Sequence, residues 1–140
     1  MKKILIVEDD RKIAVAVAVR LKANGYETLT AYDAIAGVST AVQQRPDLVL
    51  LDISMPAGSG FVVAERLQSL PRTAGTPMIF MTASKNPQFK NKAEELGAVA
   101  FFEKPFEADQ MIAAIKQALG EAPAAAAGPP AAQPPADTDR

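Results

Sequence analysis

Residues 46–56, PDLVLLDISMP, decide the fold of this chain. The four apolar residues from Leu48 to Leu51 are too few for a helix core, and proline and glycine bound them. Such a run is typical of a strand covered on both faces of a parallel sheet. Asp52 follows directly, and the carboxyl ends of parallel strands face the crevice where ligands bind. A lone strand-end aspartate would only start a turn, but other segments of the chain point to the same edge.

Four further short apolar runs are typical of strands, and five segments show helical spacing. The strands are expected at residues 3–7, 27–31, 77–82 and 98–102. The helices are expected at residues 11–24, about 33–44, 60–70, 91–96 and 108–119. Strands that alternate with helices predict a doubly wound, flavodoxin-like α/β fold of the (βα)5 type. Its five-stranded parallel sheet is expected in the order 2-1-3-4-5.

The helix expected at residues 11–24 has an ambiguous pattern. Its alternating valines also fit a strand, namely Val15, Val17 and Val19. A helix is favoured because apolar residues recur four apart from Ile13 to Leu21, and because Gly25 suits the position after a helix end. In the next helix, Asp33 is a suitable N-cap. Three apolar residues are expected to share one face of that helix: Ile35, Val38 and Val42.

The composition excludes several classes of chemistry. The 140 residues contain no cysteine and no histidine, which removes disulfides, thiol chemistry and histidine as base or phosphodonor. A formal net charge of −1 gives no general attraction to nucleic acid or anionic membranes. No apolar run reaches the roughly 20 residues of a membrane span, and the start MKKILIVEDD lacks the features of a secretory signal. We therefore expect a cytoplasmic protein without membrane insertion.

The last segment differs in composition from the rest. Residues 121–140 are dominated by alanine and proline and contain no large apolar residue. Such a segment cannot bury enough surface to offset its conformational entropy. We expect one domain at residues 1–120, followed by a disordered or partly polyproline tail or linker at residues 121–140.

Polar and charged residues gather where the expected strands end. These residues are Glu8 and Asp9 after the first strand, Asp52 after the third, Thr82 at the end of the fourth and Lys104 beyond the fifth. Three neighbouring carboxylates repel one another, and a cation that prefers oxygen ligands, such as Mg²⁺, Mn²⁺ or Ca²⁺, would relieve the repulsion. Together with a hydroxyl and an ammonium group, this set suits a phosphoryl group. Asp52 is then the natural nucleophile.

Four motifs of the chain resemble the receiver domain of two-component response regulators. They are ILIVEDD at residues 4–10, LVLLDISMP at 48–56 followed by Gly60, MTAS at 81–84 and FFEKPF at 101–106. Each motif alone is weak, but all four in this order at the expected strand ends are highly specific. The resemblance covers residues 2 to about 120 and is to the single-domain type found in chemotaxis regulators.

The resemblance implies a role for each matched residue. Asp52 matches the aspartate that accepts a phosphoryl group from a histidine kinase or a histidine phosphotransfer protein. Glu8, Asp9 and Asp52 match the residues that hold Mg²⁺, together with the main-chain carbonyl of Ser54. Of Glu8 and Asp9, Asp9 is expected to bind the metal directly. Asp10 is expected to start the first helix, where a negative charge suits the helix dipole.

The same resemblance assigns the residues of the switch. Thr82 matches the hydroxyl that moves to the phosphate, and Lys104 matches the lysine that pairs with it. Phe101 matches the aromatic residue that turns inward on phosphorylation. The peptide bond between Lys104 and Pro105 matches one that is usually cis in this family, a state available chiefly before proline.

The family implies a signalling domain that catalyses only its own phosphorylation and dephosphorylation. Its fourth helix, fifth strand and fifth helix would contact a downstream protein or a second copy of the chain, and no nucleic acid is expected to bind this domain. Val15 and Val19 lie off the inward stripe of the first helix. They are either a docking patch for the phosphodonor or ordinary surface valines.

Two alternatives remain open at this point. The chain could be the receiver part of a longer regulator. It could also be a metal-dependent phosphatase with an aspartyl nucleophile. Such enzymes need a second aspartate two residues after the nucleophile, and Ser54 occupies that position here, which argues against turnover.

Overall fold

The computed structural model describes residues 1–55 and 59–121. Pro56 of the LVLLDISMP motif and residues 122–140 of the predicted tail therefore lie outside the described residues. In chain order, the elements are β1 (Lys3–Val7), α1 (Arg11–Ala23), β2 (Glu27–Ala31), α2 (Ala34–Gln44), β3 (Leu48–Asp52), α3 (Gly60–Gln68), β4 (Met78–Thr82), α4 (Pro87–Glu95), β5 (Ala100–Glu103) and α5 (Ala108–Ala118). This alternation confirms the predicted α/β class.

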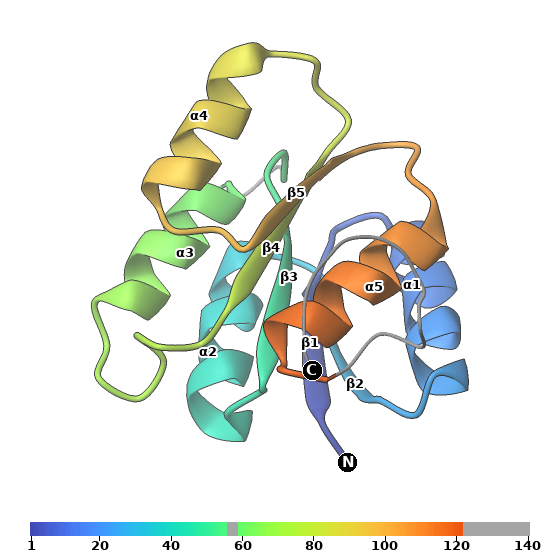
Figure 1. Ribbon diagram of the computed structural model, residues 1–140. Coiled ribbons are helices and arrows are strands. Elements are labelled where there is room, and N and C mark those ends of the chain that lie inside the picture. Colours follow the sequence, from blue (N-terminus) through green and yellow to red (C-terminus); the bar gives the residue numbers. More distant parts are fainter. Residues whose placement is uncertain (56–58, 122–140) are drawn as a thin grey trace, which may run out of the picture.

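The five strands form one parallel sheet in the order β2-β1-β3-β4-β5. The predicted order is therefore confirmed. β3 lies at the centre, and all five of its residues are buried, as the apolar run from Leu48 predicted. Because all strands are parallel, their carboxyl ends lie along the same edge (Figure 1).

Helices cover both faces of the sheet (Figure 1). One core layer lies between the sheet and α2, α3 and α4, and the other lies between the sheet and α1 and α5. Alternate residues of a strand point to opposite core layers. In β1, Leu5 and Val7 belong to the first layer, whereas Ile4 and Ile6 belong to the second. This double covering explains why the strands show continuous apolar runs.

The helix ends follow the predicted local chemistry. Asp10 and Asp33 are the N-caps of α1 and α2, and their side chains accept hydrogen bonds from main-chain N–H groups of the first turn. Gly25 follows the end of α1 with φ of 88°. That left-handed conformation is accessible to glycine without steric cost, and the prediction of a helix end there is confirmed.

Three predictions need correction. α4 begins at Pro87 rather than at Asn91, because Asn86 caps it and proline is well tolerated at the first helical position. β5 covers residues 100–103 rather than 98–102. The face predicted for α2 was also wrong at Ile35, whose side chain is 79% exposed. The buried residues of α2 are small instead: Ala34, Gly37 and Ala41.

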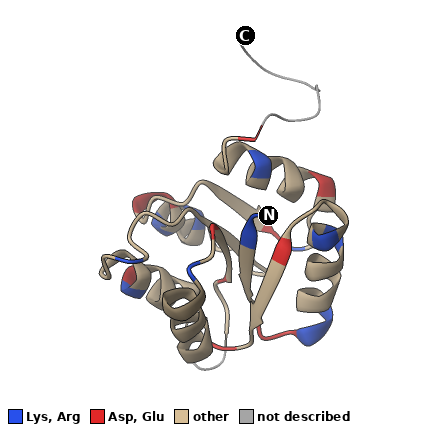
Figure 2. Cartoon of the chain, turned by 90° about the horizontal axis from the view of Figure 1, so that it is seen from below, with Lys and Arg blue, Asp and Glu red and all other residues tan. Residues whose placement is uncertain are grey.

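The surface and the end of the domain complete the description. Basic and acidic segments are interspersed around the fold in Figure 2. Among the helices that the structure describes, none combines the length and apolar character needed to cross a membrane. Glu121, the first residue of the predicted tail, accepts a hydrogen bond of 2.6 Å from the hydroxyl of Tyr26. The described chain therefore remains packed at least to this residue.

Candidate functional site

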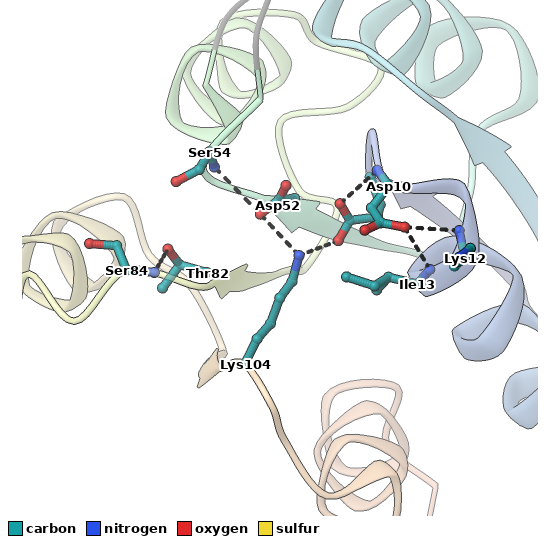
Figure 3. A network of polar contacts seen from close by, with 9 residues as sticks. Asp10, Lys12, Ile13, Asp52, Ser54, Thr82, Ser84 and Lys104 are labelled. Carbon is teal, nitrogen blue, oxygen red and sulfur yellow. Dashed lines mark hydrogen bonds and ion pairs between the residues drawn. The ribbon is translucent and has the colours of Figure 1, made fainter.

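The sheet brings the predicted site residues to one edge. Glu8 follows β1, Asp52 ends β3, and Thr82 ends β4. Lys104 follows β5 directly, and its main-chain N–H donates to the carbonyl of Thr82 at 2.7 Å. The order β1-β3-β4-β5 thus turns four separate motifs into one cluster, part of which Figure 3 shows.

The Lys104 ammonium links two carboxylates. Its Nζ lies 2.5 Å from Oε1 of Glu8 and 3.5 Å from Oδ1 of Asp52. The three side chains are strongly buried, with exposed fractions of 14% for Lys104, 1% for Glu8 and 4% for Asp52. An ion pair in such a place is weakly screened by solvent, so the lysine acts as a fixed positive charge beside Asp52.

The other oxygen of Glu8 is held by the main chain. The N–H of Asp10 donates to Oε2 of Glu8 at 3.1 Å. The Asp10 side chain accepts from the N–H groups of Lys12 and Ile13, at 2.9 and 3.3 Å (Figure 3). The start of α1 therefore fixes both the backbone of Asp10 and the orientation of Glu8. The prediction that Asp10 starts the first helix is confirmed.

Three carboxylates form an oxygen-rich cluster. One oxygen each of Glu8, Asp9 and Asp52 lies within 4.8 Å of the others. Asp9 is the most accessible of the three. An all-oxygen donor set of this size, open to water on one side, fits a hard divalent cation such as Mg²⁺, which keeps several waters and takes few carboxylates. The residues present therefore fit the metal that the sequence implies.

Burial and charge perturb the ionisation of two site residues. Burial, and after it the negative charge of Glu8, raise the pKa of Asp52, and Lys104 opposes both effects, so that the pKa lies at about 7. For Lys104, burial alone would lower the pKa. The hydrogen bond to Glu8 and the charges of Asp52 and Glu8 outweigh burial and raise the pKa. The lysine is therefore charged at neutral pH, whereas the Asp52 carboxylate needs further positive charge to ionise fully.

Thr82 and Ser54 complete the group of residues around Asp52 (Figure 3). Thr82 is fully buried, and its hydroxyl oxygen accepts a hydrogen bond from the N–H of Ser84 at 3.0 Å (Figure 3). The N–H of Ser54 donates to Oδ1 of Asp52 at 3.4 Å. The role predicted for the Ser54 carbonyl as a metal ligand stays a prediction.

The remaining predicted residues lie beside the cluster. The Lys104–Pro105 peptide bond is cis, as the sequence predicted. Phe101 is partly buried and packs against the core layer under α2, α3 and α4. Its register partner on β4 is Phe80, two residues before Thr82. Inward rotation of Phe101 on phosphorylation stays a prediction.

Sequence reasoning missed one close contact that shapes the site. The N–H of Gly60 donates to the carbonyl of Ile53 at 3.1 Å. A Cβ atom at Gly60 would lie 2.5 Å from the main-chain oxygen of Asp52. α3 therefore begins directly against the backbone of the acceptor residue. The sequence signal was the glycine itself, eight residues after Asp52.

An apolar groove runs between α1 and α5, next to the site. It has a volume of about 810 Å³, and Lys104 is one of the residues that line it. Its apolar lining comes from both helices and from the turn after β5, and includes Ile13, Val17, Val19, Phe106, Met111 and Ile112. Val15 and Val19 are exposed, at 56% and 59%, which confirms the predicted exposure. Of these two valines, Val19 lines the groove and Val15 does not.

A sequence model of the response regulator receiver domain matches residues 4–116. The chain belongs to the response regulator receiver domain family. The DNA-binding dual master transcriptional regulator RpaA of Synechocystis is 38% identical over 119 residues, which cover 85% of this chain and 49% of that protein. The phosphate regulon regulatory protein PhoB of Pseudomonas aeruginosa is 36% identical over 118 residues, covering 84% and 52%.

Solved receiver domains share the whole fold. A CheY-like receiver domain of Methanospirillum hungatei superimposes with a TM-score of 0.80 at 28% identity, covering 86% of this chain and 94% of that chain. The chemotaxis protein CheY4 of Vibrio cholerae gives a TM-score of 0.79 at 28% identity, covering 85% and 99%. This receiver domain therefore takes part in two-component signalling, and it spans about half the length of the curated relatives it matches.

Proposed function

We propose that this receiver domain accepts a phosphoryl group on Asp52 from a histidine kinase or a histidine phosphotransfer protein. A carboxylate oxygen of Asp52 attacks phosphorus, the bond from phosphorus to the donor nitrogen breaks, and an acyl phosphate forms. The electron pair of the broken phosphorus–nitrogen bond stays on the nitrogen of the donor imidazole. The protein thus acts as a signalling domain that catalyses only its own phosphorylation and dephosphorylation.

Each residue of the cluster supports one part of this reaction. Glu8, Asp9, Asp52 and the Ser54 carbonyl would hold Mg²⁺, which supplies positive charge beside the transferring oxygens. Lys104, which contacts both Glu8 and Asp52, would pair with a phosphoryl oxygen on Asp52. The buried Thr82 hydroxyl would move from its hydrogen bond with Ser84 to another phosphoryl oxygen.

One observation carries the proposal. A buried lysine contacts two buried carboxylates, and a third carboxylate lies close enough to them for the three to hold a cation, at the end of the sheet where this family's motifs fall. The perturbed pKa of Asp52 agrees with a functional carboxylate, since strongly shifted groups gather at reactive sites. Ser54 offers no acid two residues after Asp52, so a phosphatase with turnover is disfavoured.

Phosphorylation would act on the surface formed by α4, β5 and α5. Thr82 and Lys104 are joined through the main chain, and Phe101 lies opposite Phe80 in the register of β4 and β5. A phosphoryl group that engages Thr82 would shift an existing equilibrium through this strand pair. The surface would then bind a downstream protein or a second copy of the chain.

The groove between α1 and α5 is the proposed docking site for the phosphodonor. Its lining is mostly apolar, it includes Lys104 of the site, and its lining residue Val19 is exposed. A phosphodonor seated there would bring its phosphohistidine to the same sheet edge as Asp52. Because histidine kinases deliver phosphate inside the cell, we propose that the domain acts in the cytoplasm.

The direct test is the mass of the intact protein. After incubation with acetyl phosphate and Mg²⁺, the chain should gain one phosphoryl group, and Asp52→Asn should gain none. Omission of Mg²⁺ should abolish the gain in the unchanged chain. A chain that gains no mass from acetyl phosphate or from any histidine kinase in the presence of Mg²⁺ would contradict the proposal.

The alternative of a longer regulator needs a different measurement. The matched relatives are about twice as long as the matched region, and RpaA is described as DNA-binding. The mass of the native gene product separates a stand-alone receiver from the receiver part of such a regulator. The chemistry proposed for Asp52 is the same in both cases.

A further inference from the structure

α4 is a polar helix with few buried contacts to the sheet. Its sequence is PQFKNKAEE, and Ala93 is its one buried residue. Phe89 is its only aromatic residue, and it packs partly buried against the core layer of α2 and α3. In Figure 1, α4 lies beside α3 on the same face of the sheet. Few buried residues therefore fix the position of α4 on the sheet, and its contacts with α3 add to them.

An aromatic contact joins α4 to α3. The ring centroids of Phe61 and Phe89 lie 5.7 Å apart, with the rings nearly perpendicular at 76°. Phe61 also lies 5.2 Å from Phe80 of β4. Phe61 is 7% exposed, so it connects α4 to the core through two aromatic contacts.

Two polar contacts extend the same interface. Nζ of Lys92 lies 3.8 Å from Oε2 of Glu65, and it also lies 5.4 Å from the centre of the Phe61 ring. At the other end, the Gln68 side chain donates to the main-chain oxygen of Leu96. The α3 partners fall at i, i+4 and i+7, on one face of that helix. We call Phe61, Glu65 and Gln68 the α3 seat.

The α3 seat begins next to the acceptor residue. Phe61 directly follows Gly60. The N–H of Gly60 donates to the carbonyl of Ile53, and the Gly60 backbone lies in close contact with the main-chain oxygen of Asp52. The two main-chain segments lie too close for a Cβ atom to fit between them, so little room is left for a shift of the Asp52 backbone toward Gly60. It would move the start of α3, and with it Phe61.

We propose that the α3 seat couples the position of α4 to the chemical state of Asp52. This coupling rests on the proposed function and adds to it a route that does not pass through Thr82 and Phe101. Because coupling between two sites is reciprocal, a change in the α3 seat must alter the affinity of Asp52 for a phosphoryl mimic.

The test uses Mg²⁺ with beryllofluoride as the phosphoryl mimic on the full chain, followed by NMR of main-chain amides. Phe89→Ala removes the aromatic contact. Lys92→Ala and Lys90→Ala form a matched pair, because both exposed lysines lie on α4 and only Lys92 contacts the α3 seat. We expect Phe89→Ala to change the affinity for beryllofluoride by about threefold or more, and Lys92→Ala in the same direction by less. Lys90→Ala should match the unchanged chain.

The amide shifts locate the coupling. In the unchanged chain, the mimic should shift the amides of Gly60 and of α4. In Phe89→Ala, the Gly60 shift should persist while the α4 shift falls by about half or more. Equal affinities and equal α4 shifts in all variants would overturn the inference and leave the proposed function standing. Absence of a shift at Gly60 while the amides beside Asp52 do shift would overturn the inference alone, and absence of any shift in the unchanged chain would overturn the proposed function and the inference with it.

If Phe89→Ala fails to fold, the double variant Lys92→Ala with Gln68→Ala replaces it. Both residues are exposed, so their removal leaves the core intact. Hydrogen exchange gives a second measurement: α4 amides should exchange about threefold faster or more in the double variant than in Lys90→Ala. Equal exchange in the two would overturn the assignment of α3 as the seat of α4.

Discussion

Lys104 lies closer to Glu8 than to Asp52, with Nζ 2.5 Å from Oε1 of Glu8 and 3.5 Å from Oδ1 of Asp52. The lysine is therefore held by a residue that is not the proposed acceptor. Glu8 also receives the N–H of Asp10 on its second oxygen, so its position is set from both sides. This arrangement keeps the ammonium group beside Asp52. Its ion pair with Asp52 uses Oδ1 and leaves the second carboxylate oxygen for other partners.

The first prediction concerns Glu8→Gln. The substitution removes one of the negative charges that raise the pKa of Asp52, and it frees Lys104 to pair with Asp52 alone. Both changes favour the ionised carboxylate, so the pKa of Asp52 should fall from about 7 toward its ordinary value of 3.8. NMR titration of the Asp52 carboxyl carbon without metal measures this pKa. An unchanged or higher pKa would show that Glu8 does not control the ionisation of Asp52.

The second prediction concerns the pH dependence of stability without metal. The folded-state pKa of Asp52 is raised, so between about pH 4 and pH 7 the folded chain binds more protons than the unfolded chain. The free energy of unfolding contributed by Asp52 should therefore decrease as pH rises through this window. Asp52→Asn should be more stable than the unchanged chain at pH 8 by roughly 1–3 kcal/mol, and by little at pH 4.

Urea unfolding followed by circular dichroism at both pH values measures this difference. Addition of Mg²⁺ at pH 8 should reduce the advantage of Asp52→Asn, because the cation stabilises the carboxylate cluster only in the unchanged chain. An advantage of equal size at pH 4 and pH 8 would show that the effect comes from packing and not from the charge of Asp52.

The third prediction concerns Gly60→Ala. The added Cβ would lie 2.5 Å from the Asp52 carbonyl oxygen, so the start of α3 must shift, and we expect a loss of about 1–3 kcal/mol in the free energy of unfolding. Gly75→Ala is the matched control, because a Cβ there meets nothing within 4 Å. Urea unfolding compares the two variants, and phosphorylation by acetyl phosphate should slow only in Gly60→Ala. Equal stability of both variants would contradict the close contact.

The sequence predicted the gathering of the cluster because buried strands with polar ends pair in parallel, and the sheet order was taken from the flavodoxin-like pattern. The residues Asp52 and Thr82 end apolar runs, and parallel pairing then leaves them on the same edge. The pattern could not predict which acid holds Lys104, because that depends on distances between side chains from different strands. It also could not predict the Gly60 contact, which depends on the path of the chain after β3.

The errors in the helices have similar physical causes. The face of α2 was predicted from its large apolar residues, but small residues are buried there, and a Cβ at Gly37 would lie 3.0 Å from a methyl group of Val7. Close packing of α2 on β1 thus leaves Ile35 in solvent. The start of α4 was missed because a polar helix has no apolar period, although Asn86 and Pro87 carried the signal of a helix start.

The last prediction tests the groove between α1 and α5 as the docking site of the phosphodonor. Val19→Lys places a charge on the apolar rim of the groove without entering the Asp52 cluster. Phosphotransfer from a histidine kinase that labels the unchanged chain should slow by about tenfold or more, because an apolar contact is replaced by a charge that must be desolvated. Labelling by acetyl phosphate, which needs no docking, should stay the same. Ile35→Lys is the matched control, because Ile35 is even more exposed and lies on α2, across the sheet from the groove. Equal transfer rates for the two variants would show that the phosphodonor does not bind in the groove.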